Sequence, residues 1–129
     1  MSFQKYDFSV TQQTTESYVI EIKDELQNPR DMTGFDFYLQ CRQSPTSESD
    51  IFTLSSTGAP ATIVLGQTDT NTSVFDQITL LLTHDLTSGL DFDKGVYDLL
   101  MYNTARSHVE LLMSGTVTLK RVVTRLPAV

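Results

Sequence analysis

The side chains that most often carry out chemistry are sparse in this sequence. Its two histidines are His84 and His108, and its single cysteine is Cys41. A zinc site needs several His, Cys or carboxylate ligands at short spacing, and we find no such spacing around either histidine. A cysteine nucleophile needs an activating base or a helix N-terminus. Cys41 instead continues an alternating apolar series, so we interpret it as a small buried hydrophobic residue.

Carboxylates are more frequent, with eleven Asp and five Glu residues. The segment Asp91–Gly95 matches only the start of a calcium loop, because Tyr102 stands where the closing Glu would be. Paired carboxylates can hydrolyse glycosides, but most of these acids fall in expected turns or on outward strand positions. No Gly-x-Ser-x-Gly elbow and no glycine-rich phosphate loop is present in the sequence. We therefore expect no catalytic residue, no cofactor and no metal site.

The charges are divided unequally along the chain. Residues 1–119 carry all sixteen acidic residues and six basic ones, whereas the last ten residues contain three basic residues and no acid. The net charge of −7 disfavours binding to nucleic acid. The basic tail could dock on an acidic partner, including another copy of this chain, or it could be a solvated strand end. The residues that we expect to bind partners are Phe3, Lys5, Lys120, Arg121 and Arg125.

Alternation of apolar and polar residues is the dominant pattern. Tyr18, Ile20 and Ile22 form one such series, and a longer one runs from Val109 to Leu119. Because successive strand side chains point to opposite faces, this pattern predicts antiparallel sheets with one buried face. The expected strands lie near 6–12, 17–23, 35–42, 51–55, 62–65, 74–83, 95–103 and 108–120. The last strand is expected to bend at Gly115.

One segment departs from this alternation. Thr83 is a candidate N-cap and Gly89 a closing glycine, so we expect a single helical turn over 84–90. Leu86 and Leu90 would then cover an open end of the core.

Length and composition predict a single domain. We expect residues 1–129 to form an antiparallel β-sandwich, immunoglobulin-like or jelly-roll-like, of about eight strands. Short arms are expected at 1–5 and 121–129. No apolar run is long enough to span a membrane, and residues 1–5 lack the apolar core of a signal peptide. A single cysteine fits folding in a reducing cytoplasm.

Some strands are expected to be apolar on both faces. In the strand at 95–103, Val96, Leu100 and Tyr102 alternate with other apolar residues. The positions that we expect to point outward although they are apolar are Tyr38, Leu81, Leu99, Met101 and Leu112. Such a face is covered either by a loop of the same chain or by a partner.

Several segments resemble a known group of proteins. They are Asp31–Phe35, Leu82–Leu86, Gly95–Leu99, Val109–Leu119 and Val123–Arg125. Their order resembles small tail-associated virion proteins of bacteriophages, similar to the N-terminal domain of baseplate upper proteins. The resemblance spans residues 7–125, with Met32 in place of a leucine, and departs from the group at residues 67–73 and in the basic tail. It implies a β-sandwich without catalytic residues.

We therefore expect a virion structural protein that is made in the host cytoplasm. It would link tail, neck or baseplate components to fibres or neighbouring subunits, and would bind other virion proteins and copies of itself, but neither nucleic acid nor membranes. A capsid decoration protein is the alternative within this class. A carbohydrate-binding module using Tyr6, Phe75 or Tyr102, and a small hydrolase using His84 or His108, are alternatives of other classes.

Overall fold

The computed structural model describes residues 4–58, 61–124 and 127. Within these residues the chain forms nine strands and one short helix. In chain order they are β1 (Gln4–Lys5), β2 (Phe8–Thr11), β3 (Glu16–Glu21), β4 (Asp36–Arg42), β5 (Phe52–Ser55), β6 (Ile63–Gly66), β7 (Gln77–Leu82), α1 (His84–Ser88), β8 (Lys94–Tyr102) and β9 (Val109–Lys120). None of the described helices has the length and apolar composition needed to cross a membrane.

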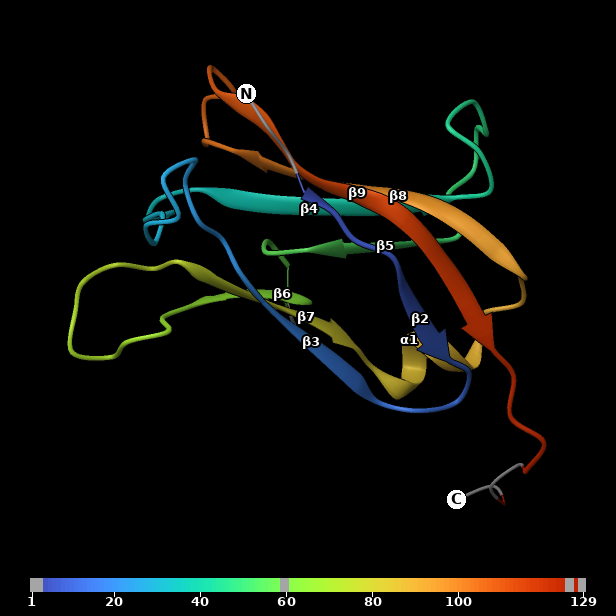
Figure 1. Cartoon of the computed structure of the whole chain (residues 1–129). Coiled ribbons are helices and arrows are strands. Elements are labelled where there is room, and N and C mark those ends of the chain that lie inside the picture. The colour runs from blue at the N-terminus through green and yellow to red at the C-terminus, as the bar shows by residue number, and fades with distance from the viewer. Residues whose placement is uncertain (1–3, 59–60, 125–126, 128–129) are drawn as a thin grey trace.

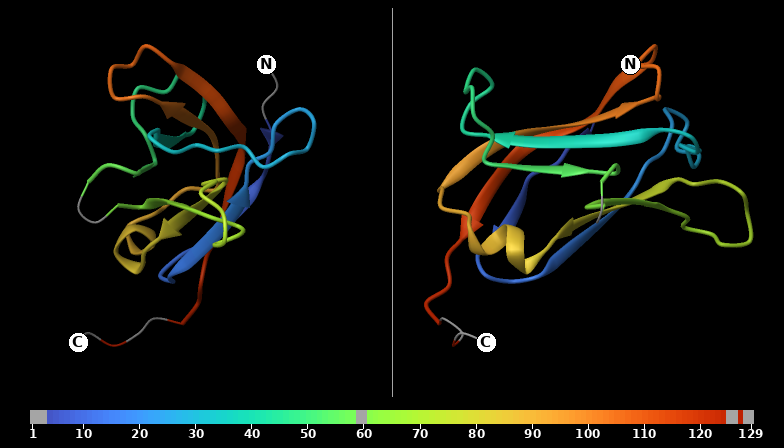
Figure 2. Two further views of the ribbon diagram at one scale, coloured as in Figure 1. Left: turned by 90° about the vertical axis from the view of Figure 1, so that its left-hand side faces the viewer. Right: turned by 180° about the vertical axis from the view of Figure 1, so that it is seen from behind.

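The strands form two sheets that face each other as layers (Figures 1 and 2). The six-stranded sheet has the order β1-β9-β8-β4-β5, with β2 also paired to β9, and the three-stranded sheet has the order β3-β7-β6. This is the strand order of an immunoglobulin-like sandwich, in which strands G, F, C and C′ face strands B, E and D. The expected β-sandwich is confirmed.

Pairing of the N-terminal segment differs from the expectation of a purely antiparallel fold. β1 and β2 both run parallel to β9, whereas all other named strand pairs are antiparallel. Residues 12–15 connect β2 to β3, which lies in the opposite sheet. β2 therefore pairs with β9, a strand distant in sequence, and not with the strand that follows it. Gln4 and Lys5 are paired in β1, so this part of the expected arm 1–5 belongs to the sheet.

The core lies between the two sheets and consists of inward-facing apolar residues. Phe37 and Leu39 from β4 are fully buried, as are Leu80 from β7 and Leu99 from β8. The expected helical turn is also confirmed, since the Thr83 side chain accepts a hydrogen bond from the backbone N–H of Leu86 at the start of α1. Leu90 is buried and Leu86 packs against the core, so together they cover one end of it.

The alternation of β9 is interrupted by a β-bulge. Leu99 pairs with Met113 and Leu100 with Leu111, which leaves Leu112 as an extra residue in β9. As a result both Leu112 and Met113 are buried. The expected bend at Gly115 is therefore misplaced, because the register shifts next to Leu112.

The bulge and the pairing of β8 correct three expected side-chain directions. Leu99, Met101 and Leu112 are buried in the core and do not point outward. In β8 the outward residues are the alternate set that includes Leu100 and Tyr102, which are partly exposed. The strand is therefore apolar on both faces, as expected. However, the residues expected to point outward face the core, and the alternate set faces outward.

Cys41 lies fully buried on β4, and this burial raises the pKa of its thiol to about 12. Since the thiolate is the reactive form, we expect a thiol reagent such as DTNB to leave the folded protein unmodified. One equivalent should react once urea unfolds the chain. Rapid labelling of the folded protein would contradict the burial of this residue.

Candidate functional site

The outer face of the six-stranded sheet, which points away from the core, carries an unusual set of side chains. Cross-strand pairing places Tyr38, Leu100 and Leu111 in one row across β4, β8 and β9. Tyr102 and Val109 form the next row. Tyr38 is 38% exposed and Val109 53% exposed, so these five residues form an apolar patch that water can reach.

Charged and polar side chains adjoin the apolar patch on the same face. Lys5 on β1 pairs with Ser114 on β9, which pairs in turn with Asp98 on β8. Asp98 pairs with Gln40 on β4. Four neighbouring strands thus place residues that are distant in sequence in a single row.

Hydrogen bonds fix the orientation of several of these side chains. The Arg42 guanidinium donates to the carbonyl oxygens of Ser47 at 2.9 Å and Glu48 at 2.7 Å, and to Gln40 Oε1 at 2.8 Å. Gln40 Nε2 in turn donates to the Tyr38 hydroxyl at 3.3 Å. The Arg106 guanidinium stacks over the ring of Tyr102 at 5.0 Å, a cation–π arrangement.

Two adjoining hollows lie in this face. One has a volume of about 470 Å³ and is lined by residues that include Lys5, Arg42, Asp98 and Leu100. The other, of about 430 Å³, is lined by residues that include Leu100 and Arg106. We refer to the two together as the outer-face hollow.

The charge of the outer-face hollow is opposite in sign to that of the whole chain. Lys5, Arg42 and Arg106 contribute three positive charges and Asp98 one negative charge, whereas the chain carries −7. Within the described residues, none of these three cations forms an ion pair with a carboxylate. Tyrosine and arginine are enriched at the centres of protein interfaces. The face is thus suited to binding.

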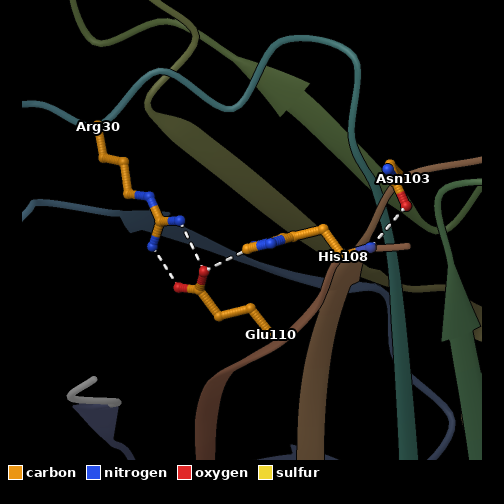
Figure 3. A network of polar contacts seen from close by, with 4 residues as sticks. All are labelled: Arg30, Asn103, His108 and Glu110. Atoms are coloured by element: carbon orange, nitrogen blue, oxygen red, sulfur yellow. Dashed lines mark hydrogen bonds and ion pairs between the residues drawn. The ribbon is translucent and has the colours of Figure 1, made fainter. Parts of the chain in front are cut away.

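A second polar cluster lies at the start of β9 (Figure 3). The Glu110 side chain is only 2% exposed, and its two oxygens accept hydrogen bonds from the two terminal nitrogens of Arg30. His108 Nε2 lies 3.1 Å from Glu110 Oε1. The hydrogen bonds from Arg30 lower the pKa of Glu110 despite its desolvation, and the contact with His108 adds to this effect. The cluster thereby fastens the loop between β3 and β4 to β9.

Sequence analysis missed this cluster. The search around His108 was for a set of ligands at metal-ligand spacing, and it passed over the single carboxylate of Glu110, which follows His108 by two residues and faces the same side of the strand. The His-x-Glu spacing was the signal in the sequence that could have revealed this contact. The participation of Arg30 had no such signal, because Arg30 lies eighty residues from Glu110 in the sequence. No group of three or more metal-binding side chains occurs among the described residues.

The three expected partner-binding residues that the structure describes do not form one surface. Lys5 lines the outer-face hollow. Lys120 is exposed at the far end of β9, roughly 20 Å along the strand from the partner of Lys5. Arg121 donates to Asp91 Oδ1 at 2.7 Å and to Asp93 Oδ1 at 3.3 Å. Phe3 and Arg125 lie outside the described residues.

The residues of the other hypotheses are also scattered. Of Tyr6, Phe75 and Tyr102, only Tyr102 lines the outer-face hollow. His84 lies exposed on α1, where its Nε2 is 3.2 Å from the hydroxyl of Ser88, far in sequence from His108 and the buried Glu110.

No protein-family model matches the chain, and no curated protein is similar to it in sequence. The outer-face hollow is the candidate binding site, because it combines exposed apolar area, oriented polar groups and a charge opposite in sign to that of the whole chain.

Proposed function

We propose that this protein is a structural subunit of a bacteriophage particle, an adaptor in the tail, neck or baseplate region that links tail components to fibres or neighbouring subunits. The observation that carries the proposal is the outer-face hollow. A rigid sheet presents Tyr38, Leu100 and Tyr102 beside hydrogen-bonded Gln40 and Arg42. Covering such a surface with another protein chain removes apolar area from water without the need to order flexible side chains.

The segments that resemble phage tail proteins support the proposal through the positions they occupy. In the first, Asp31 Oδ1 accepts hydrogen bonds from Thr33 and from the backbone N–H of Phe75, so this turn joins two loops. In the third, the hydroxyl of Tyr97 donates to the carbonyl oxygen of Tyr6 at 2.5 Å. These residues hold the sandwich together, as expected for a domain whose role is to be a stable building block.

The proposal is tested in the particles of the source phage. Mass spectrometry and electron microscopy of purified particles should find the protein in the tail region, in several copies. Leu100→Glu places a carboxylate in the middle of the apolar patch and should reduce incorporation at least about tenfold. Val64→Glu is the matched control, since Val64 is 45% exposed on the other sheet, and should leave incorporation unchanged.

Two outcomes would overturn the proposal. One is that the protein occurs only in the soluble fraction of infected cells and never in finished particles. The other is that Leu100→Glu enters particles as well as the unmodified chain. If the protein is found on the capsid instead, it is a decoration protein.

Carbohydrate binding is a second candidate, favoured by one observation. Tyr38 and Tyr102 lie on the same sheet face as Gln40, Arg42 and Asp98, and sugars are bound by aromatic rings beside hydrogen-bonding groups. Binding of the purified protein to a glycan array, abolished by Tyr38→Ala, would favour this function over the adaptor role.

A further inference from the structure

The loop between β3 and β4 carries an exposed leucine at its tip. Leu26 is 81% exposed, and an aliphatic side chain of this size gains free energy when a partner covers it. The loop lies at one end of the sandwich (Figure 1), and its later part is joined to β9 by the contact of Arg30 with Glu110. We refer to residues 24–28 as the Leu26 tip.

The Leu26 tip is held in one conformation by its own hydrogen bonds. Asp24 Oδ1 accepts from the backbone N–H groups of Leu26 and Asn28, each at 2.9 Å. The backbone N–H of Asp24 donates to the carbonyl oxygen of Asn28 at 2.9 Å, and Lys23 and Pro29 form a bridge below the turn. A loop held this way loses little backbone conformational entropy when it docks.

The charges around Leu26 are predominantly acidic. Asp24 and Glu25 are exposed within the tip and Glu21 at the end of β3, against one exposed cation, Lys23. The outer-face hollow has the opposite character, with the cations Lys5 and Arg106 around an apolar centre. Tip and hollow are therefore complementary in both charge and polarity.

The same charges disfavour symmetric pairing. Two hollows placed face to face would bring the cations of one copy against the cations of the other, and two tips would bring carboxylates together. Like charges juxtaposed in an interface oppose association. The favourable pairing joins a tip to a hollow, and such a head-to-tail contact leaves one free tip and one free hollow for further copies.

We infer that the occupant of the outer-face hollow is a second copy of this chain, whose Leu26 inserts beside Tyr38 and Leu100 while Asp24 and Glu25 face Lys5, Arg42 and Arg106. The inference rests on the proposed role of this face as a docking surface. It specifies the partner, namely the next subunit in a row.

Sedimentation velocity between about 10 µM and 1 mM covers the range expected for a small interface of this kind. The unmodified protein should form a ladder of species that grows with concentration and shrinks in 1 M salt. Leu26→Arg should raise the concentration needed for association at least tenfold. Val123→Arg is its matched control, because Val123 is 97% exposed outside both surfaces, and it should behave as the unmodified chain.

Mixing two variants tests the head-to-tail geometry directly. Leu26→Arg removes the tip, and Leu100→Glu removes the hollow, with Arg106→Glu as a second hollow variant at an exposed residue. Each alone should be monomeric and folded by circular dichroism. A mixture retains one intact tip and one intact hollow, so it should form a one-to-one heterodimer and nothing larger.

Three results would overturn the inference. They are an unmodified protein that stays monomeric throughout, association that survives Leu26→Arg, and a mixture that forms no heterodimer. A monomeric protein that still enters particles would overturn self-docking and leave the adaptor role standing. A protein that self-associates as expected but is absent from particles would overturn the adaptor role and leave self-docking standing.

Discussion

Replacing Gly115 with alanine is expected to destabilise the protein by about 3 kcal/mol, because a Cβ atom has no room at this position. It would overlap the carbonyl oxygen of Tyr6 and lie 2.8 Å from Asp7 Oδ1. Since the first obstacle is backbone, relief requires the chain at Tyr6, between β1 and β2, to move away from β9. That movement would break the hydrogen bonds from Thr116 N to Asp7 Oδ1 at 2.9 Å and from the Tyr97 hydroxyl to Tyr6.

Urea unfolding measures this effect as a lower midpoint with an unchanged slope. Gly89→Ala is the matched control, because the nearest atom to its Cβ would be 4.0 Å away and its φ of −90° suits alanine. We expect that control to change stability by less than about 0.5 kcal/mol. A loss below about 1 kcal/mol for Gly115→Ala would show that the N-terminal strand does not lie where we describe it.

Removing the guanidinium of Arg30 with Arg30→Met is expected to destabilise the fold by about 3 to 5 kcal/mol at neutral pH. The substitution leaves the carboxylate of Glu110, whose side chain is 2% exposed, with His108 as its remaining partner in the cluster. A buried charge that loses its partner is far more costly than the pair was favourable.

The dependence of this effect on pH has a definite sign. In the unmodified protein Arg30 lowers the pKa of Glu110 below its ordinary value of 4.5. Its contribution to stability is therefore complete above that value and is lost as the pH falls through the lowered pKa. In the variant, burial without the guanidinium should raise the pKa of Glu110. The stability difference between the two proteins should be largest at pH 7 and shrink towards pH 4.

Two further variants make the interpretation specific. Adding Glu110→Leu to Arg30→Met removes the buried charge and should restore most of the lost stability. Arg121→Met removes two ion pairs whose carboxylates on Asp91 and Asp93 are 83% and 96% exposed, and should leave stability nearly unchanged because exposed pairs are screened by water. A deficit for Arg30→Met that is equal at all pH values would contradict the role of Glu110.

Local patterns in the sequence were enough to predict the class of fold and most of its elements. The strands expected at 35–42 and 95–103 correspond to β4 and β8, and the helical turn expected over 84–90 corresponds to α1. These predictions succeeded because alternation and helix capping are local properties, which residues a few positions apart decide. The resemblance to phage tail proteins was expected from turn and core residues, and both this resemblance and the virion role stay predictions.

The directions of side chains in β8 and β9, and the set of residues that share the outer face, depend on tertiary contacts. In the run Leu111–Leu112–Met113 every residue is apolar, so periodicity alone does not locate the bulge that pairing with β8 creates. Likewise, Lys5 and Arg106 line adjoining hollows, and Arg30 contacts Glu110, because of strand order and register. Strand order and register are long-range properties. They are set by how the sheets bury their apolar faces together and not by the spacing of residues along the chain.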